Sequence, residues 1–353
     1  MLQIKYVGFD VHKATTVVVV LCADGSVFIR AEIPTTEQGI IGFLGTLNGT
    51  VHVAFEEGTQ AQWLHDLIEP LVSSVTVCRG LPRAPKRNKS DRIDAFELAR
   101  QLRSGDLRAV FHRYSSNLRH LRHLVRAYET AVSDSVRTML RLKALFRGIG
   151  RPIDTHSLYN PKHRNRWCGE LATAGERTRA GFLYDTLQTL RDVRTRSKAQ
   201  LLVQSRSHPA YKLLTSHPLI GPIRAAELTA LLGSPFRFRT KRQLWAYGGF
   251  AIRTWSSGEF DVRSGKIVRT RPPMTRGLSP DFNRHLKRVL KSLATDLCCR
   301  QGPYGDWYRR RLAAGMRPDM AKLARARKVA SVILITWKKG EPFDPDRLIR
   351  DFN

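Results

Sequence analysis

The chain has 353 residues and a large excess of positive charge, with 60 Lys and Arg against 30 Asp and Glu and a formal net charge of +30. Its five cysteines are scattered without paired spacing, which argues against a disulfide framework or a zinc site and favours reduced intracellular thiols. No apolar run approaches the roughly 18 residues of a membrane span. The charge balance favours nucleic acid as the partner over a membrane surface.

The first part of the chain alternates strand and helix patterns in the order β-β-β-α-β-α-β-α. Asp24-Gly25 is a strong hairpin signal between the second and third strands. The order is that of RNase H-like domains, so we predict an α/β fold of this type. The expected strands cover residues 4–10, 15–22, 27–33, 51–56 and 75–78, and the expected helices cover 35–47, 61–71 and 90–102.

Four acidic residues occupy informative places in this pattern. Asp10 closes an apolar strand and Glu56 closes another, and in an RNase H-like sheet these strands are neighbours. Asp91 and Asp94 are three residues apart at the start of a helix, so they share a face. Four carboxylates in one cleft suit Mg²⁺ or Mn²⁺. Two such ions about 4 Å apart stabilise the attacking and leaving oxygens of phosphoryl transfer.

Each acid taken singly has a plainer reading, as a turn residue or a carboxylate that complements the helix dipole. The set in the correct topological order favours the metal site. Glu57 stands next to Glu56. If Val53 and Phe55 face the core layer, Glu56 points to the opposite face, but the pattern does not say which face meets the cleft. Glu56 is therefore the preferred metal ligand, and Glu57 is the alternative.

A helical arm is expected after the first domain. Two long helical patterns, about 117–147 and 176–205, flank a polar segment with several basic residues. They predict either a two-helix hairpin packed on itself or a subunit interface. The first pattern carries apolar residues at coiled-coil spacing over about four heptads, namely Leu118, Leu121, Val125, Tyr128, Val132, Met139, Leu142 and Phe146, with Ser135 at one core position.

The C-terminal part is predicted to be mainly α-helical. Residues 217–222 resemble a helix-hairpin-helix turn, whose amides can hold a DNA phosphate, although Leu219 stands where that motif usually has glycine. A basic linker is expected from Gly258 to Gly277. The expected helices cover residues 223–232, 241–250, 279–297 and 322–338.

Three segments resemble the DEDD motifs of a bacterial insertion-sequence transposase family, the DEDD/serine recombinases that work with a bridge RNA. They are Gly-Phe-Asp-Val-His-Lys at 8–13, Phe-Glu-Glu-Gly-Thr at 55–59, and Asn-Lys-Ser-Asp-Arg-Ile-Asp-Ala at 88–95, the most specific of the three. The resemblance extends from Tyr6 to about Pro345. It implies a RuvC-like catalytic domain over 1–112, a coiled-coil arm over 113–210, and a C-terminal transposase domain over 211–353.

The resemblance also implies a catalytic serine. Ser257 precedes Gly258 and matches the family pattern best, while Ser256 stays open as the neighbour. The family resemblance implies that Ser257 attacks the scissile phosphate and becomes joined to DNA, activated by the metal-bound carboxylates. Without it, Ser-Ser-Gly would read as an ordinary loop. The serine lies far from the acids in the sequence, so the active site is expected to assemble from two domains, within one subunit or across subunits.

Basic residues flank both catalytic candidates and are predicted to bind the phosphate backbone of nucleic acid, which provides affinity without base specificity. No zinc finger, homeodomain or RNA-recognition signature offers a direct reader of base sequence. This fits targeting by a guide RNA, as the resemblance implies. The predicted contacts are Lys86, Arg87, Lys89, Arg263, Lys266, Arg269, Arg271 and Arg276.

The resulting hypothesis is an RNA-guided DNA recombinase that acts as a transposase in the bacterial cytoplasm, in association with the nucleoid. Its expected partners are double-stranded DNA (element ends or junctions and target), a non-coding bridge RNA and further copies of itself, as a dimer or tetramer. One rival is a junction-resolving nuclease that uses the same carboxylates with water as nucleophile. A second rival is a non-catalytic nucleic-acid-binding protein with a decayed RuvC-like fold. The occupied acidic positions count against the second rival.

Overall fold

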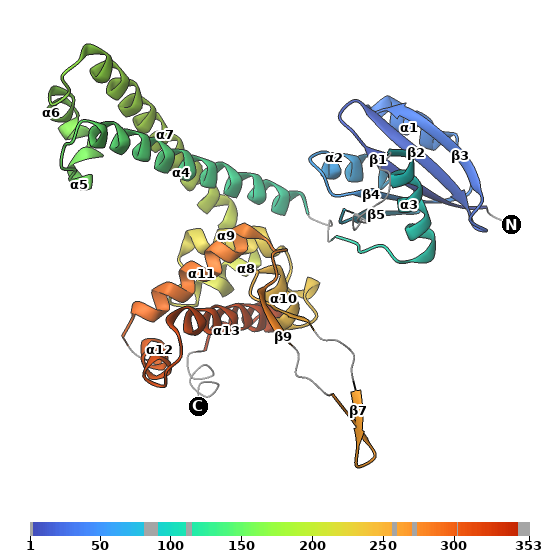
Figure 1. The fold of residues 1–353 in the computed structure, drawn as a ribbon. Coiled ribbons are helices and arrows are strands. Elements are labelled where there is room, and N and C mark those ends of the chain that lie inside the picture. The colour runs from blue at the N-terminus through green and yellow to red at the C-terminus, as the bar shows by residue number, and fades with distance from the viewer. Residues whose placement is uncertain are drawn as a thin grey trace. The chain divides into compact units, whose positions relative to one another are not determined.

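The computed structural model describes residues 3–80, 91–110, 115–255, 260–269, 274–301 and 303–344. The chain forms two compact units, Met1–Arg113 and Tyr114–Asn353, drawn in Figure 1. The first unit contains a mixed sheet with helices, and the second is mostly helical. This confirms the coarse prediction of an N-terminal α/β domain followed by helical regions, and it fits an RNase H-like arrangement.

The N-terminal unit contains a five-stranded sheet in the order β3-β2-β1-β4-β5. The first three strands are antiparallel, and β4 and β5 run parallel to β1. Every predicted element of this unit is present in the predicted order. The bounds are β1 Ile4–Val11, β2 Thr15–Cys22, β3 Val27–Pro34, α1 Glu37–Gly45, β4 Thr50–Glu56, α2 Ala61–Ile68, β5 Ser74–Cys78 and α3 Asp91–Ser104.

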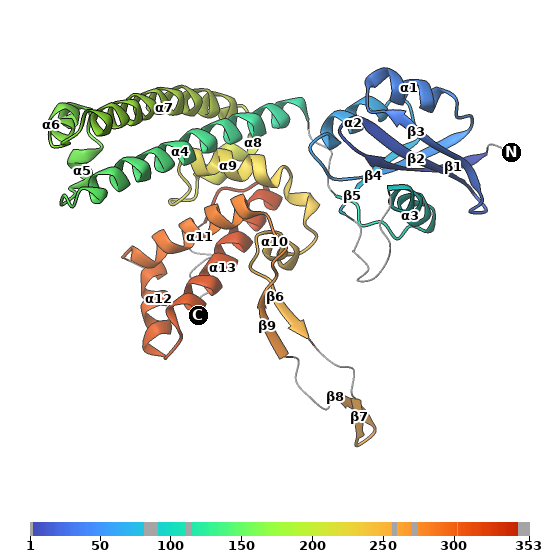
Figure 2. The same ribbon diagram turned by 45° about the horizontal axis from the view of Figure 1, so that its top comes forward.

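The two faces of this sheet are covered differently. Figure 2 shows α1 and α2 on one side of the sheet and α3 on the other. Phe9 of β1 and Phe55 of β4 are buried in the core with α1 and α2. On the opposite face, Val19 of β2 packs with Ala95 and Ala99 of α3. Because side chains alternate along a strand, neighbouring residues of β1 and β4 belong to different layers.

Two helices of 33 residues each form the arm, α4 Ser116–Gly148 and α7 Ala174–Arg206. They pack along each other, as Figures 1 and 2 show. The predicted hairpin is confirmed, whereas its description as a coiled coil and its role in subunit contact remain predictions. Short helices that were not predicted lie between the two, namely α5 Thr155–Leu158, η1 Pro161–His163 and α6 Arg164–Gly169.

The buried face of α4 departs from the predicted heptads in its middle. Thr138 is buried there, while Met139, predicted at a core position, is only partly buried. A straight helix has 3.6 residues per turn, so its buried stripe drifts from a strict seven-residue repeat. Ser135 is buried as predicted, and its hydroxyl donates a hydrogen bond to the carbonyl of Ala131 (2.7 Å). In the middle of α4, small residues therefore occupy buried positions that large apolar residues occupy elsewhere in the helix.

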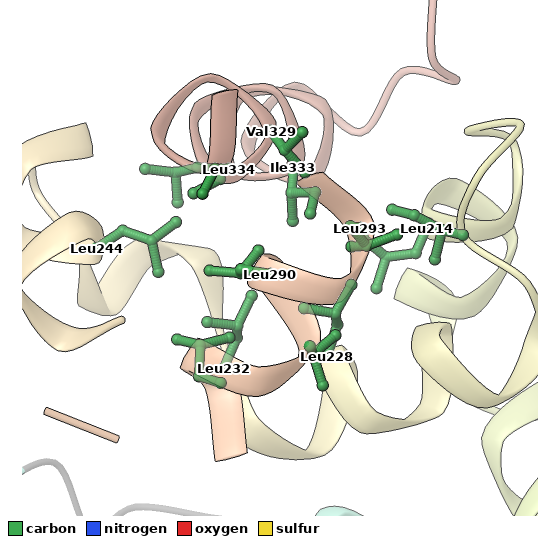
Figure 3. Packing of buried hydrophobic residues seen from close by; sticks show 14 of the residues in the cluster. Leu214, Leu228, Leu232, Leu244, Leu290, Leu293, Val329, Ile333 and Leu334 are labelled. Atoms are coloured by element: carbon green, nitrogen blue, oxygen red, sulfur yellow. The ribbon is translucent and has the colours of Figure 1, made fainter. Parts of the chain in front are cut away.

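The C-terminal helices surround one apolar core. Figure 3 shows Leu228 and Leu232 of α9, Leu290 and Leu293 of α11, and Ile333 of α13 converging there. Apolar residues of α4 and α7 form a second buried cluster with residues of α9. The predicted boundary between the arm and the C-terminal domain therefore remains a prediction. The bounds are α8 Pro209–Thr215, α9 Pro222–Leu232, η2 Pro235–Arg237, α10 Lys241–Tyr247, α11 Arg284–Cys299, α12 Pro303–Ala313 and α13 Pro318–Lys339.

Short strands lie in the expected basic linker from Gly258 to Gly277 and just before it, which corrects the prediction. Strand β6 Ile252–Trp255 pairs with β9 Met274–Leu278, and β7 Phe260–Arg263 pairs with β8 Lys266–Arg269, both antiparallel. Ser264 and Gly265 connect the second pair with positive φ angles of 53° and 73°, the backbone of a two-residue hairpin. The next helix also begins later than predicted, at Arg284, because the Asn283 side chain caps it.

All five cysteines are free thiols, as predicted. Among the helices of the described ranges, none combines the length and apolar character needed to cross a membrane.

Candidate active site

Gly8 of β1 brings α3 into direct contact with the sheet. A Cβ atom at this position would lie 2.1 Å from the carbonyl oxygen of Ala95 and 2.6 Å from the amide nitrogen of Ala99. Only glycine therefore allows this close approach. Asp10 lies two residues further along β1 and so on the same face as Gly8. The helix packed against this face is α3, and its first turn carries Asp91.

Asp10 and Asp91 come together here, and Asp94 and Glu56 lie near enough for their charges to act on Asp10. The pKa of Asp10 is raised above its ordinary value, chiefly because the side chain is partly buried. His12 opposes the shift, and the negative charges of Asp91, Asp94 and Glu56 add to it. All three carboxylates thus lie close enough to repel the charge of Asp10. The Asp10 side chain is 19% exposed and that of Asp91 52%, so the cluster opens toward solvent.

Strand alternation places Glu56, and not Glu57, in this cluster. Phe55 pairs with Phe9 in the parallel register of β4 and β1 and is buried on the side of α1 and α2. Glu56 therefore belongs to the face covered by α3. Its carboxylate lies near Gly80, where a Cβ would sit 3.4 Å from Glu56 Oε2. Glu57 follows the last residue of β4, and its backbone amide donates to the carbonyl of Cys78.

His12 is a member of the cluster that the sequence reasoning missed. Its Nε2 atom lies 3.3 Å from Asp10 Oδ2 and 3.3 Å from Asp91 Oδ2. The backbone amide of His12 donates to Thr15 O (2.9 Å), which fixes the tight connection between β1 and β2. The signal was present in the Gly-Phe-Asp-Val-His-Lys segment. A residue two positions after Asp10 falls on the same side of an extended chain.

The donor set fits a divalent cation. One donor atom each from Asp10, His12 and Asp91 lie within 4.8 Å of one another. His12 Nε2 is shielded from solvent yet makes no hydrogen bond, since its contacts with the two carboxylates lack hydrogen-bond geometry. A shielded polar atom without a hydrogen bond is uncommon in folded proteins. Carboxylate oxygens and an imidazole nitrogen are ligands of Mn²⁺ and other first-row metals.

Several predicted site residues lie outside the described residues. They are Lys86, Arg87, Lys89, Ser256, Ser257 and Arg271. Four further predicted phosphate contacts fall on strands that the sequence reasoning did not anticipate. Arg263 ends β7, Lys266 and Arg269 begin and end β8, and Arg276 lies in β9.

The chain just before the serine segment contacts α13 and the residues that precede α11. Gly249 has a φ of 74°, and a Cβ there would lie 2.6 Å from Cγ of Phe282. The next carbonyl, of Phe250, accepts a hydrogen bond from Nε of Arg327 in α13 (2.8 Å). These contacts fix where β6 begins, and β6 leads directly to residue 256.

Two amides of the turn at 217–222 are used internally. His217 and Leu219 are both buried. The amide of Leu219 donates to Nδ1 of His217 (3.3 Å), and the amide of Ile220 donates to the carbonyl of His217 (2.9 Å). These two amides are used within the turn, and phosphate binding at 217–222 remains a prediction.

Comparisons with known proteins point the same way for both units. Residues 7–150 match the profile of a family described as a DEDD transposase of IS110. Residues 211–297 match a second family, described as the transposase IS116/IS110/IS902 family. These matches support an insertion-sequence transposase. The first matched stretch, 7–150, contains all four carboxylates, and the second, 211–297, contains residues 256 and 257.

A similar protein from Streptomyces coelicolor is named the insertion element IS110 uncharacterized 43.6 kDa protein. It is 29% identical over 164 residues, which are 45% of this chain and 36% of that protein. The aligned stretch thus spans only about a third of the length of this IS110 relative. The carboxylate cluster is consistent with the divalent metal use that the DEDD family suggests.

Proposed function

We propose that this protein is an insertion-sequence transposase that cleaves and exchanges DNA strands by metal-dependent phosphoryl transfer. The observation that carries the proposal is that Asp10, Asp91 and His12 form a group able to hold a metal ion beside an RNase H-like sheet, with Asp94 and Glu56 near enough for their charges to act on Asp10. The matches to two transposase families, in order along the chain, support it independently. A formal net charge of +30 suits a protein that binds polyanions.

In this proposal the N-terminal unit holds the ion. Asp10 is positioned by β1 and by the close packing of α3 on Gly8. Asp91 and Asp94 are positioned by the first turn of α3, and Glu56 by the end of β4. Mg²⁺ or Mn²⁺, when bound, supplies positive charge that stabilises the pentacovalent transition state. The carboxylates fix where that charge sits.

The proposed nucleophile is Ser257, with Ser256 as the neighbouring alternative. Its Oγ forms a bond to the scissile phosphorus, the bond from phosphorus to the leaving sugar oxygen breaks, and the serine proton passes to a base. The product is a serine–DNA ester that preserves the energy of the phosphodiester for strand exchange. The anchoring of β6 on α13 through Phe250 and Arg327 suits a segment that must present one side chain reproducibly.

The remaining partners are part of the same proposal. The residues that bind the phosphate backbones of DNA and of a bridge RNA are Lys86, Arg87, Lys89, Arg263, Lys266, Arg269, Arg271 and Arg276. The RNA supplies sequence recognition. The active protein is a dimer or tetramer, because strand exchange needs several active sites held together. The expected location is the bacterial nucleoid.

One alternative uses the same carboxylates differently. A RuvC-like junction-resolving nuclease would need only the cluster of the first unit, with water as the nucleophile. Ser257 would then be a loop residue without chemistry, and no covalent protein–DNA product would form.

A denaturing gel for protein–DNA adducts tests the proposal. The full-length protein is mixed with RNA transcribed from the flanking non-coding DNA, labelled element-end DNA and Mg²⁺. Wild type is compared with Ser257→Ala, Ser256→Ala and Asp10→Asn. An adduct present in wild type and in Ser256→Ala, but lost in the other two variants, is the expected result. Cleaved DNA without an adduct in wild type would support the water-using nuclease instead.

A further inference from the structure

We infer that His12 is a nitrogen ligand of the divalent ion, so that the site is a mixed nitrogen–oxygen centre and not an all-carboxylate one. The inference rests on the proposed function, since it names a further ligand for the same ion. It rests on the position of the His12 ring relative to Asp10 and Asp91.

The distances fit a shared ion. Atoms bound to one cation at about 2.1 Å lie roughly 3 Å apart when they occupy neighbouring corners of an octahedron. His12 Nε2 lies 3.3 Å from Asp10 Oδ2 and 3.3 Å from Asp91 Oδ2. Both values exceed that spacing by only a few tenths of an ångström. All three donor atoms lie within 4.8 Å of one another, so an ion can be placed among the three groups after side-chain adjustment.

The orientation of the ring also favours a ligand over a structural histidine. The His12 side chain is 42% exposed overall, but its Nε2 atom is turned inward and shielded. A structural histidine in such a position would normally satisfy Nε2 with a well-aligned hydrogen bond. Here Nε2 faces two carboxylates without hydrogen-bond geometry. A neutral imidazole whose Nε2 lone pair points at a metal ion accounts for this orientation of the ring.

The backbone holds the histidine where a ligand is needed. The His12 amide donates to Thr15 O, which closes the connection from β1 to β2 next to Asp10. Asp10 and His12 therefore come from one rigid strand end, and Asp91 comes from the helix packed across it. Ligands on such elements keep their spacing when the ion binds, which lowers the cost of ordering the site.

A nitrogen ligand changes which metal the site prefers. Mg²⁺ strongly favours oxygen ligands, whereas first-row transition metals accept imidazole nitrogen, and Mn²⁺ is the one among them that also suits carboxylates. The wild-type protein should therefore prefer Mn²⁺ over Mg²⁺ more strongly than a variant without the imidazole. Loss of one ligand of this kind is expected to weaken Mn²⁺ binding on the order of 10-fold or more, with a smaller effect on Mg²⁺.

Pulsed electron paramagnetic resonance of the Mn²⁺-loaded full-length protein tests the inference directly. A bound imidazole produces ¹⁴N modulation of the Mn²⁺ spin echo, and ¹⁵N-histidine labelling changes that modulation. His12→Gln removes the imidazole nitrogen, because a glutamine amide binds a cation through its oxygen. His52→Gln is the matched control, because His52 lies on β4 of the same sheet, where its Nδ1 lies 2.7 Å from Ser74 Oγ and its ring stacks on Tyr6.

The expected result is nitrogen modulation in wild type and His52→Gln, its loss in His12→Gln, and weaker Mn²⁺ binding only in the last. Wild-type protein that binds Mn²⁺ without nitrogen modulation would overturn the inference and leave the proposed function intact. This measurement needs no variant to fold. Mn²⁺ binding that is unaffected by Asp10→Asn would instead remove the metal centre on which the proposed function depends.

Discussion

Gly8 of β1 lies against the carbonyl of Ala95 in α3 with no space for a side chain between them, since a Cβ on Gly8 would come within 2.1 Å of that oxygen. This contact sets the distance between the strand that carries Asp10 and the helix that carries Asp91. One glycine without a chemical role thus determines whether the carboxylates of two distant segments meet.

Gly8→Ala is expected to push α3 away from β1. Because the obstacle is backbone on a packed helix, the loss of unfolding free energy should be roughly 3 kcal/mol, the upper end for overpacking, and Mg²⁺-dependent cleavage should be lost. Gly42→Ala in α1 is the control, because nothing lies within 4 Å of a Cβ there. It should be neutral or stabilising by roughly 0.5–1 kcal/mol. Urea unfolding and a cleavage assay measure both, and equal stabilities would contradict the role of the contact.

Glu56→Gln should reduce DNA cleavage on the order of 100-fold or more, since one charge that holds the ion is removed. Glu57→Gln is the matched control at the adjacent position. Strand alternation places Glu57 away from the α3 face, so this variant should cleave at the wild-type rate. Single-turnover cleavage at saturating Mg²⁺ distinguishes the two. A larger loss in Glu57→Gln would show that β4 presents its end differently.

Arg288 of α11 joins two poorly exposed carboxylates from the arm and from α9. It contacts Glu129, and its Nη2 donates to Glu227 Oε1 (2.9 Å). Burial raises the pKa of Glu227 above its usual range, and the charge of Arg288 opposes that shift.

Arg288→Met should therefore destabilise the second unit. The expected loss is roughly 2–3 kcal/mol, below the range for a fully buried pair because half of the Arg288 side chain is exposed. The control is Arg137→Met, which breaks an exposed pair with Asp134 on α4 and should cost less than about 0.5 kcal/mol. Thermal unfolding of both variants tests this, and equal losses would mean that the cluster adds nothing beyond a surface pair.

His217 should make the stability of the second unit sensitive to mild acid. Burial lowers the pKa of His217 from 6.5 to about 4. The unfolded chain therefore takes up a proton before the folded one does. The stabilisation is complete above pH 6.5 and is lost as the pH falls from about 6.5 to about 4, at up to about 1.4 kcal/mol per pH unit.

Urea unfolding of wild type and His217→Gln between pH 7.5 and 4.5 measures this effect. The variant should be less stable at pH 7.5 but lose less stability on acidification. Some slope should persist, because burial also lowers the pKa of His208. Parallel pH profiles for the two proteins would show that His217 is accessible to protons in the folded state.

Local patterns were sufficient for the N-terminal unit and for the long helices. Strand alternation, hairpin turns and cap residues act over a few neighbours, so the element order could be predicted from the sequence. The same patterns placed Asp10 and Glu56 at strand ends and Asp91 and Asp94 on one helical face. The strands β7 and β8 were missed because each has only four residues, and their charged residues were taken as part of a basic linker.

Chain order and periodicity are enough to show which acids can meet, because they dictate strand ends and helix faces. Packing between the sheet and α3 places Glu56 and not Glu57 on the α3 face and brings His12 into the cluster. Alternation defines two faces of a strand, but it does not say which face α3 covers. Packing between segments far apart in the chain decides which face is covered, and the contact of Gly8 with α3 is an example.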